Sequence, residues 1–389
     1  MNPLCIVPVM MPKFPREISV DADSKEWELQ TIAVLGWGAW ATTLAVMLGR
    51  KFAGSQAVSL RWRIRPDRTY NGRSLLDVVR VQRENAKRLP GILIPSKVTL
   101  VGTLEEAIAE ASAIIFAVPS RYVNETASLV SKVPDDAILI HASKGVLSSG
   151  KHLQTVSMVL SETLHVGYSR LAVLSGPNIA IDVAANFAEE DTRHWSPVVS
   201  ALGSAGEQTR RKAGSLLHYP GIFRVYTSKD IKGIELCGIL KQIYSIAVGL
   251  CDGLGFSAST RSSLRSRCVA EFRRLIHHIR VTRPEYRSVR ESTFDSPAGY
   301  GDFDVTSSSG RNRTVGVWLA EGAGVNEITS RMRGQVAEGI DAVRLLWRHV
   351  SDWDVHVPVL KQIYSVIWEG KPPMDAARAC VEADQPGVI

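Results

Sequence analysis

Residues 31–49 have the sequence TIAVLGWGAWATTLAVMLG, which predicts a strand, a glycine-rich turn and a helix in direct succession. The turn has the spacing GxGxxA: Gly36 permits a tight bend, Gly38 lets the backbone approach a pyrophosphate, and Ala41 is small enough for the helix to pack on the strand. The N-terminus of that helix would face the phosphates with its N–H groups. The stretch therefore predicts a dinucleotide site formed by Gly36, Trp37, Gly38, Ala39, Trp40 and Ala41.

Strand-like and helix-like segments continue to alternate after this stretch, which favours a mostly parallel sheet covered by helices, a Rossmann-type α/β fold. Strands are expected at 31–35, 57–64, 112–118, 137–141 and 171–174, helices at 39–51 and 74–88, and a strand, a helix and a strand at the sheet edge within 194–226. From residue 228 onward, long apolar runs at helical spacing dominate, chiefly 229–250 and 336–367. We predict a mobile N-terminal extension (1–28), a Rossmann-like dinucleotide-binding domain (29–228) and an all-helical substrate and catalytic domain (229–389).

The bulk composition is that of a soluble globular protein with more than one domain. The 389 residues are 45% apolar and 22% charged, and the chain is too long for one ordinary core. A net charge of +7 fits either solubility or a small phosphate-bearing ligand. No nucleic-acid motif is present, so a nucleic-acid partner is not expected.

The cysteines and the apolar runs predict a cytoplasmic protein without a membrane span. Five cysteines without CxxC spacing indicate neither a disulfide framework nor a zinc site, and no metal is expected. The first 15 residues contain four prolines and run into acidic residues, unlike a signal or transit peptide. The longest apolar run, 239–250, is interrupted by Lys241 and is too short to cross a bilayer.

Lys241 is the strongest catalytic candidate. Between Lys232 and Leu250 only Glu235 and Lys241 are charged, and burial of an ammonium group among apolar side chains lowers its pKa. Such a lysine can exchange a proton near neutral pH, although a salt bridge to Glu235 is the alternative interpretation. Downstream, Arg311-Asn312-Arg313 suits a phosphate, which a guanidinium binds through two parallel hydrogen bonds.

The end of the second expected strand bears on the choice of cofactor. An acidic residue for the ribose hydroxyl is usual there, but this chain has Arg61, Arg63 and Arg65. Arg63 and Arg65 could hold a 2′-phosphate, so NADP stands open beside NAD. Surface arginines without a ligand role are the alternative interpretation.

A set of ordered motifs connects these features. The matching segments are Gly36 to Trp40, Glu84 to Gly91, Ala142 to Gly145, Leu174 to Ala180, Glu235 to Gln242, Cys251 to Phe256, Gly299 to Asp302, Gly310 to Arg313 and Gly334 to Gly339. In these segments the chain resembles the NAD-dependent glycerol-3-phosphate dehydrogenase family, as a divergent member, from Thr31 to about Val381.

The resemblance implies roles for particular residues. Lys241 corresponds to the proton acceptor that serves the C2 hydroxyl of glycerol 3-phosphate while hydride leaves C2 for the nicotinamide. Lys144 corresponds to a second active-site lysine near substrate and cofactor, and Asp302 and Thr306 to residues that bond the substrate region. The remaining implied positions are Arg311, Asn312, Gly176 and Asn178 on the substrate side, and Ala180, Arg311, Gln335 and Glu338 on the cofactor side.

The same resemblance implies an activity and a setting. The expected enzyme interconverts sn-glycerol 3-phosphate and dihydroxyacetone phosphate with NAD or NADP, in glycerol 3-phosphate, carbohydrate and glycerolipid metabolism. It is expected to be a cytoplasmic homodimer, with the small phosphorylated substrate in the cleft where the helical domain meets the strand ends.

Three positions depart from the family pattern. Gln242 replaces a usual asparagine, Ser259 a usual asparagine and Arg261 a usual lysine, and the segment 273–296 is unusually basic. These departures keep two alternatives open. One is a catalytically weakened dinucleotide-binding regulator, and the other is a dehydrogenase of the same fold that acts on a different phosphorylated or carboxylated alcohol.

Overall fold

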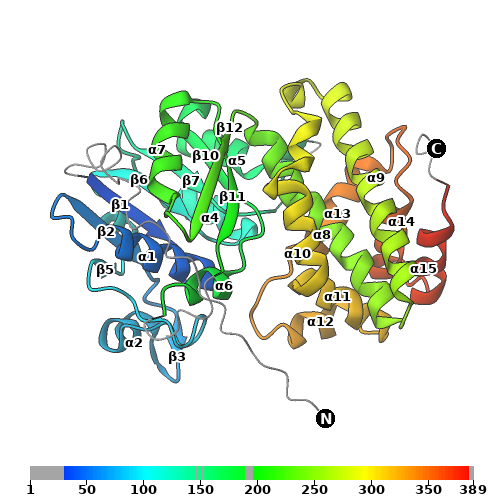
Figure 1. The fold of residues 1–389 in the computed structure, drawn as a ribbon, viewed down its shortest axis with the longest axis horizontal. Coiled ribbons are helices and arrows are strands. Elements are labelled where there is room, and N and C mark those ends of the chain that lie inside the picture. The colour runs from blue at the N-terminus through cyan, green and yellow to red at the C-terminus, as the bar shows by residue number, and fades with distance from the viewer. Residues whose placement is uncertain (1–29, 146, 150–151, 189–195, 385–389) are drawn as a thin grey trace, which may run out of the picture.

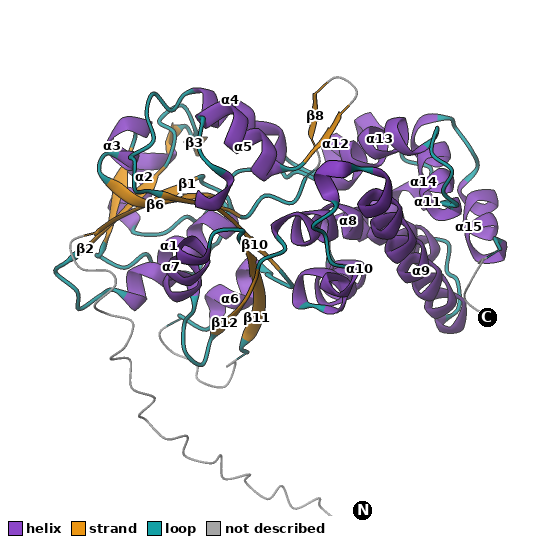
Figure 2. Cartoon of the chain, turned by 90° about the horizontal axis from the view of Figure 1, so that it is seen from above, coloured by secondary structure: helices purple, strands orange, loops and turns teal. Residues whose placement is uncertain are grey.

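The computed structural model describes residues 30–145, 147–149, 152–188 and 196–384. The expected N-terminal extension, residues 1–28, lies outside the described residues. Figure 1 shows two parts side by side, a sheet covered by helices and a group of helices without a sheet. Seen from above in Figure 2, the strands again gather in one half of the molecule, with the strand β8 (Leu147–Ser149) near the middle.

The described part of the first half contains an eight-stranded sheet in the order β12-β11-β10-β7-β6-β1-β2-β5. Every pairing in it is parallel except that of β10 with β11. This sheet and the helices after it confirm the predicted fold class. Its strands are β1 (Gln30–Leu35), β2 (Val58–Arg63), β5 (Val98–Val101), β6 (Ala111–Phe116), β7 (Ile138–His141), β10 (Leu171–Ser175), β11 (Val198–Gly203) and β12 (Phe223–Ser228). Two short hairpins pair β3 (Thr69–Tyr70) with β4 (Arg73–Ser74), and β8 (Leu147–Ser149) with β9 (His152–Gln154).

Helices cover both faces of the sheet, because successive residues of a strand point to opposite sides. On β1, Ile32 and Val34 join a core with α1, α2, α6 and α7, whereas Ala33 and Leu35 join a core with α3, α4 and α5. These helices are α1 (Ala39–Lys51), α2 (Leu75–Gln82), α3 (Leu104–Ile108), α4 (Val123–Ser128), α5 (Val156–Leu164), α6 (Ala180–Ala185) and α7 (Glu207–Leu217).

The second half is built around α8 (Ile231–Gly253), which contacts α9, α10, α11, α13 and α14. The other helices are α9 (Ala258–Thr282), α10 (Asp302–Ser309), α11 (Arg311–Ala320), α12 (Val325–Arg331), α13 (Glu338–Val350), α14 (Pro358–Trp368) and α15 (Pro373–Glu382). Shorter turns are η3 (Ser120–Tyr122), η4 (Tyr168–Arg170), η6 (Pro284–Tyr286), η7 (Glu291–Asp295) and η8 (Pro297–Gly301). At 23 residues, α8 is long and apolar enough to cross a membrane, but its apolar window is 100% buried inside the protein. This burial is that of a core helix.

One predicted element was wrong in its bounds, one strand was missed, and one apolar run contains more than a single helix. The helix expected at 74–88 ends at Gln82, because Arg83 adopts a left-handed φ of 52°. The strand β5 was missed, since its four residues leave little room for a pattern. The run 336–367 forms two helices, α13 and α14, with a break before Pro358.

The helices α8 and α11 cross with their backbones in contact, which is possible only because glycines lie at the crossing. A Cβ atom on Gly316 would lie 2.1 Å from the carbonyl oxygen of Ile246, and one on Gly249 would lie 2.0 Å from that of Arg313. The close crossing fixes the start of α11 relative to the middle of α8.

The first turn of α8 is held by the buried carboxylate of Asp230. Its Oδ1 accepts from the backbone N of Gly233 at 2.9 Å, and its Oδ2 accepts from the backbone N of Arg290 at 2.8 Å and from the Thr293 hydroxyl at 2.5 Å. Asp230 is 3% exposed, so water cannot replace these bonds if the side chain is removed.

We therefore expect Asp230→Ala to lower the free energy of unfolding by about 2 kcal/mol, as measured by urea denaturation. Ser257→Ala is the matched control, because Ser257 caps α9 through one exposed bond of 3.2 Å to the backbone N of Thr260. The control should cost about 0.5–1 kcal/mol. Equal losses in the two variants would contradict the role given to Asp230.

Candidate active site

The turn after β1 has the open backbone that a dinucleotide needs. Gly36 has a φ of +128°, and a Cβ atom there would lie 2.4 Å from the carbonyl oxygen of Ala117. A Cβ on Gly38, which precedes α1, would meet nothing within 4 Å, so the space before the helix is open. The indole Nε1 of Trp62 donates to the carbonyl oxygen of Gly36 at 2.6 Å and holds the turn against β2. The first turn of α1 thus fits a pyrophosphate.

The two tryptophans of the motif lie in different surroundings. Trp37 is covered by the Arg88 guanidinium, 4.3 Å from its ring centre, with Lys87 and Arg68 also within cation–π distance. Trp40 packs on the ring of Phe223 at 6.0 Å, within the core of the sheet part. Trp37 thus lies beside positive charges, and Trp40 packs the helix against the sheet.

The two arginines predicted for the cofactor differ in their pairing. Arg65 binds both carboxylate oxygens of Asp67 at 3.0 Å and Glu125 at 3.2 Å, so two acids balance its charge. Arg63, the last residue of β2, has no ion pair within the described residues, and its shielded Nε has no hydrogen-bond partner there. Burial and the charge of Arg65 lower the pKa of Arg63. Arg63 is therefore the freer cation at this strand end.

All four predicted catalytic side chains meet in one cluster. The Lys241 ammonium, on α8, donates to Asp302 Oδ1 at 2.9 Å and to the Thr306 hydroxyl at 2.7 Å. The Lys144 ammonium, on the loop after β7, donates to Asp302 Oδ2 at 2.5 Å and to the carbonyl oxygen of Gly176 at 2.8 Å. Two lysines, one from each half of the protein, therefore share a single carboxylate at the start of α10.

Burial and neighbouring charges shift the pKa values of Lys241 and Asp302 in this cluster. Burial lowers the pKa of Lys241 from 10.5 to about 8; the Asp302 carboxylate opposes this, and the charges of Lys144 and Arg311 add to it. Burial alone would raise the pKa of Asp302, but the two ammonium groups outweigh it and hold that pKa below its usual value. The cluster can hence offer a neutral amine at Lys241 near pH 8 beside an ionised Asp302.

The alternative partner for Lys241 was wrong. Glu235 lies on α8 as well, but its Oε1 accepts from the backbone N of Ser157 at 2.7 Å and lies 3.1 Å from Nε2 of His141. Its carboxylate binds the sheet part of the chain instead of the lysine.

A second polar network lies next to the lysines and joins the two halves. The Gln242 amide donates to the carbonyl oxygen of Lys144 at 2.5 Å and to Glu338 Oε2 at 3.3 Å. Glu338 Oε1 accepts from the backbone N and the hydroxyl of Ser120 at 2.6 and 2.8 Å. Sequence reasoning missed Ser120 and treated Gln242 only as a departure, because neither partner is near in sequence.

The phosphate candidates lie at the start of α11. Asn312 is 7% exposed; its Nδ2 donates to Gln242 Oε1 at 3.4 Å and its Oδ1 accepts from the backbone N of Gly339 at 3.1 Å. Arg311 is exposed and has no ion pair within the described residues, yet its charge lowers the pKa of both Lys241 and Arg88. Arg311 is therefore an uncompensated cation between the lysine cluster and the dinucleotide turn.

The remaining predicted residues are less directly connected to the cluster. The Asn178 amide donates to the Ser200 hydroxyl at 3.0 Å, and its shielded Oδ1 has no partner in the described chain. The carbonyl oxygen of Ala180 accepts from the Thr43 hydroxyl at 2.9 Å, which joins α6 to α1. Gln335 is exposed in the loop before α13, and the structure does not bring its side chain into the lysine cluster.

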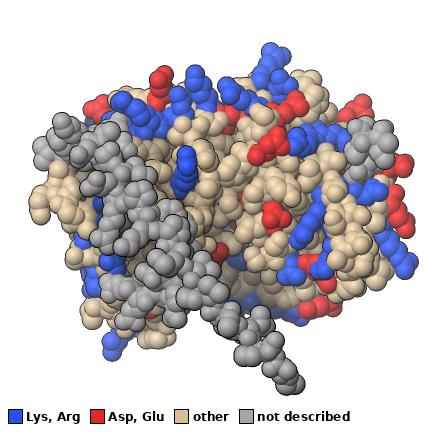
Figure 3. Space-filling model, viewed as in Figure 1, with Lys and Arg blue, Asp and Glu red and all other residues tan. Residues whose placement is uncertain are grey.

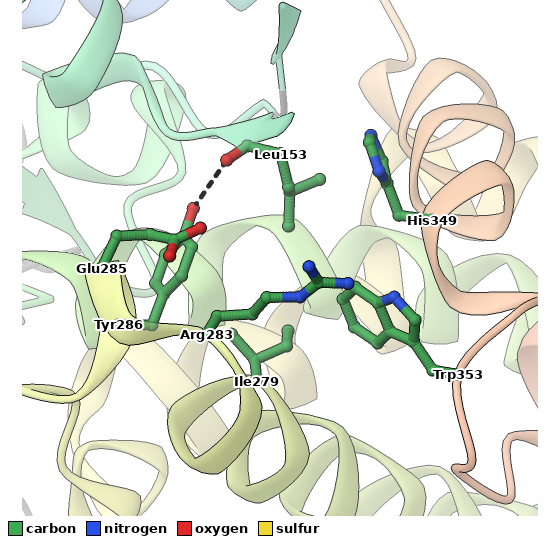
Figure 4. A pocket seen from close by; sticks show the side chains of 7 residues that line it. All are labelled: Leu153, Ile279, Arg283, Glu285, Tyr286, His349 and Trp353. Atoms are coloured by element: carbon green, nitrogen blue, oxygen red, sulfur yellow. Dashed lines mark hydrogen bonds between the residues drawn. The ribbon is translucent and has the colours of Figure 1, made fainter. Parts of the chain in front are cut away.

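The cavity in Figure 4 is not a substrate site. It has a volume of about 10 Å³, room for no more than one water molecule. The Tyr286 hydroxyl, which donates to the carbonyl oxygen of Leu153 at 3.2 Å, and the stacked pair of Arg283 with Trp353 fill the space around it.

Comparisons with known proteins agree along nearly the whole chain. Residues 31–192 match the family described as NAD-dependent glycerol-3-phosphate dehydrogenase N-terminus, and residues 230–378 match its C-terminus. The chain is 32% identical over 344 residues to a Chlorobium luteolum protein named glycerol-3-phosphate dehydrogenase [NAD(P)+], covering 88% of this chain and 94% of that one. A protein of the same name from Geobacter sp. is 32% identical over 351 residues, covering 89% and 95%. The crystal structure of a Coxiella burnetii glycerol-3-phosphate dehydrogenase superposes with a TM-score of 0.76 at 27% identity, covering 91% and 99%.

Proposed function

The chain belongs to the NAD-dependent glycerol-3-phosphate dehydrogenase family, and from this we propose how its own residues perform the reaction. It is an NAD(P)-dependent oxidoreductase that interconverts glycerol 3-phosphate and dihydroxyacetone phosphate. The observation that carries the proposal is the pair of lysines on one carboxylate, beside the open dinucleotide turn. No comparable observation favours the two alternatives, a catalytically weakened dinucleotide-binding regulator and a dehydrogenase of the same fold for a different phosphorylated or carboxylated alcohol.

Lys241 is the proposed general base. In its neutral form the amine accepts the proton of the C2 hydroxyl, and a nicotinamide cofactor, when bound, would supply the hydride acceptor for the oxidation at C2. In the reverse direction the ammonium of Lys241 returns the proton to the carbonyl oxygen. With a pKa of about 8, both the neutral amine and the ammonium form of Lys241 are populated near neutral pH.

Asp302 and Lys144 are the proposed supporting residues of the reaction. The ionised Asp302 orients the Lys241 amine through Oδ1 and compensates the charge of Lys144 through Oδ2. Lys144, held also by the carbonyl oxygen of Gly176, keeps a positive charge beside the C2 oxygen, where negative charge develops. Thr306 fixes the Lys241 amine from the same helix as Asp302.

Arg311 and Asn312 are the proposed phosphate-binding residues. The guanidinium of Arg311 has no acid partner within the described residues and can donate two parallel hydrogen bonds to a phosphate. The Asn312 amide is held in place by Gln242 and Gly339, so it offers a fixed neutral donor. Gly176 and Asn178 complete the proposed substrate side.

The proposed cofactor site combines the Gly36 to Ala41 turn with residues from both halves. The open space before α1 would take the pyrophosphate, and the family resemblance adds Ala180, Arg311, Gln335 and Glu338 on the cofactor side. Because Glu338 already binds Ser120 and Gln242, we propose that it orders the wall of this site.

The cofactor preference is proposed to depend on Arg63. We expect Arg63→Ala to raise KM for NADPH about 10-fold or more and to leave KM for NADH within about 2-fold, because a charged hydrogen bond to the 2′-phosphate contributes about 1.5–3 kcal/mol. Steady-state kinetics with dihydroxyacetone phosphate measure both constants. Arg65→Ala, which removes a cation already paired with two acids, is the control and should change KM less. A larger effect at Arg65 would reverse the assignment.

The pKa of Lys241 predicts opposite pH dependences for the two directions. Oxidation needs the neutral amine, so its kcat/KM should rise with pH through a midpoint near 8, whereas reduction needs the ammonium and should fall through the same region. The carboxylate of Asp302 raises the pKa of Lys241, so Asp302→Asn should move the midpoint to lower pH. Rate profiles between pH 6 and 10 test this. Profiles that show no midpoint within this range would exclude Lys241 as the titrating base with its lowered pKa.

The direct test of the proposed function is an assay of the purified protein. Oxidation of NADH and of NADPH is followed with dihydroxyacetone phosphate as acceptor, beside a panel of other phosphorylated and carboxylated ketones. Preference for dihydroxyacetone phosphate supports the proposal. Cofactor binding without turnover of any ketone would favour the regulator instead.

We propose a cytoplasmic location and a homodimer as the setting of the enzyme. The four described cysteines, Cys237, Cys251, Cys268 and Cys380, are free and buried, which suits a reducing compartment. In Figure 3 the Lys and Arg side chains on the visible face lie among acidic and uncharged residues. The homodimer stays a prediction from the family.

A further inference from the structure

A second polar pocket lies away from the lysine cluster, where four helices meet. It has a volume of about 240 Å³ and lies between the end of α8, the start of α9, the end of α10 and the start of α11. Its lining is almost entirely polar and comprises Asp252, Ala258, Arg261, Ser262, Arg265, Ser308 and Arg313.

Three arginines and one carboxylate line this pocket. Asp252, whose side chain is 7% exposed, binds Arg261 through Oδ1 at 2.9 Å and Arg313 through Oδ2 at 2.5 Å. Each carboxylate oxygen is thus paired with one guanidinium. With Arg265 included, the lining carries three positive charges and one negative charge, a formal excess of two.

Arg265 is the unsatisfied member of the set. It forms no ion pair within the described residues, and its NH2 reaches only the Ser308 hydroxyl at 3.5 Å. Its Nε is shielded from solvent and has no acceptor in the described chain. A buried donor without an acceptor costs free energy, and an anion in the pocket would remove that cost after a small rotation of the guanidinium.

The pocket is separate from the proposed substrate site. Asp252 lies 11 residues after Lys241 on α8, roughly 16 Å along the helix axis. Ser308 and Thr306 are two residues apart on α10, and so are Arg313 and Arg311 on α11, which places the members of each pair on roughly opposite sides of their helix. The Arg-Asn-Arg motif is therefore divided: Arg311 and Asn312 lie toward the lysines, and Arg313 lies in the second pocket.

We propose that this second pocket binds a small phosphate-bearing anion, either inorganic phosphate or a soluble phosphate monoester. A doubly charged phosphate matches the excess of two positive charges, and its oxygens match the forked donors of arginine. The N-terminus of α9 at Ala258 adds a favourable dipole. The volume of about 240 Å³ is below that of a site for a drug-sized ligand, which suits a compact anion.

The test counts phosphate sites on the full chain by equilibrium dialysis with radiolabelled inorganic phosphate at low ionic strength. The wild type is expected to bind two equivalents, and Arg265→Gln one, with an affinity loss of about tenfold or more at the second pocket. Arg311→Ala should retain the site that Arg265→Gln loses. The two variants distinguish the second pocket from the proposed substrate site. Arg265→Gln should lose one bound phosphate relative to the wild type, whether or not the site at Arg311 also binds free phosphate.

Control variants guard against a general loss of charge or of folding. Arg348→Gln, which removes an exposed positive charge on α13 outside the pocket, should keep both sites. Arg265→Lys should still bind phosphate at the second site, with weaker affinity. Arg265→Gln should retain kcat and KM within about 2-fold in phosphate-free buffer, because Arg265 does not touch the proposed catalytic residues. The same number of bound equivalents, with the same affinity, in the wild type and in Arg265→Gln would overturn the proposal. Binding to phosphatidic acid vesicles without binding of free phosphate would also overturn it, because the ligand would then be a lipid headgroup.

Discussion

Replacing Lys241 by alanine is expected to lower turnover by about 10²-fold or more in both directions, because the reaction loses its proton-transfer group. Binding of NADH, followed by its fluorescence, should remain unchanged, since the dinucleotide turn lies on the other half of the protein. Asp302 would still be paired with Lys144 at 2.5 Å, so no isolated buried carboxylate is created. Lys241→Met tests the same loss while it preserves most of the side-chain volume.

Lys51→Met is the matched control for Lys241. Lys51 donates to the carbonyl oxygens of Ser215 and His218 at 2.5 and 2.7 Å at the end of α7, away from the lysine cluster. This variant should lower stability but leave kcat unchanged. Addition of a small alkylamine should partly restore turnover in Lys241→Ala and not alter the control. Turnover close to that of the wild type in Lys241→Ala would remove the lysine from the mechanism.

Gly316→Ala is expected to lower the free energy of unfolding by about 3 kcal/mol, at the upper end of the usual cost of overpacking. The added Cβ would lie 2.1 Å from the carbonyl oxygen of Ile246 and 2.6 Å from the backbone N of Leu250, and backbone atoms cannot rotate away as a side chain would. The helix α11 must move, and Arg311 and Asn312 move with it. We therefore also expect KM for dihydroxyacetone phosphate to rise about tenfold or more.

Urea denaturation and steady-state kinetics measure the two effects of Gly316→Ala. Gly324→Ala is the control, because a Cβ at Gly324 would meet nothing within 4 Å and its φ of −79° suits any residue. That control should change stability by no more than about 0.5 kcal/mol. If Gly316→Ala behaves like Gly324→Ala, the crossing of α8 and α11 does not position the phosphate-binding residues.

The sequence predicted elements well where the local signal and the tertiary context agree. The helix expected at 39–51 has those bounds in the structure, because its apolar residues face the sheet and the glycine turn sets its start. The helix expected at 74–88 stops six residues early, because Arg83 leaves helical φ and its guanidinium binds the carbonyl oxygens of Ile94 and Val98. Those partners are set by the tertiary fold, and no local pattern indicates them.

In the candidate site, too, the sequence predicts residues with a local signal and misses contacts that the tertiary fold sets. Lys241 could be predicted from the sequence, because burial of a single cation in an apolar helix costs free energy and therefore indicates a functional role. No local pattern indicates its partners: Asp302, 61 residues away, and Glu338 were named only through the family resemblance. Ser120, which contacts Glu338 across 218 residues, was missed. The sequence also could not show that Arg311 and Arg313 face different pockets, because that depends on how α11 packs against α8.

The carboxylate of Asp302 is bonded to one lysine from the sheet half and one from the helical half. Relative displacement of the halves by even an ångström would break one of these bonds. The pKa of Lys241, which depends on both Asp302 and Lys144, would then change. Mild heat or dilute denaturant that loosens only this boundary should thus abolish catalysis while both cores stay intact, and inactivation would precede melting.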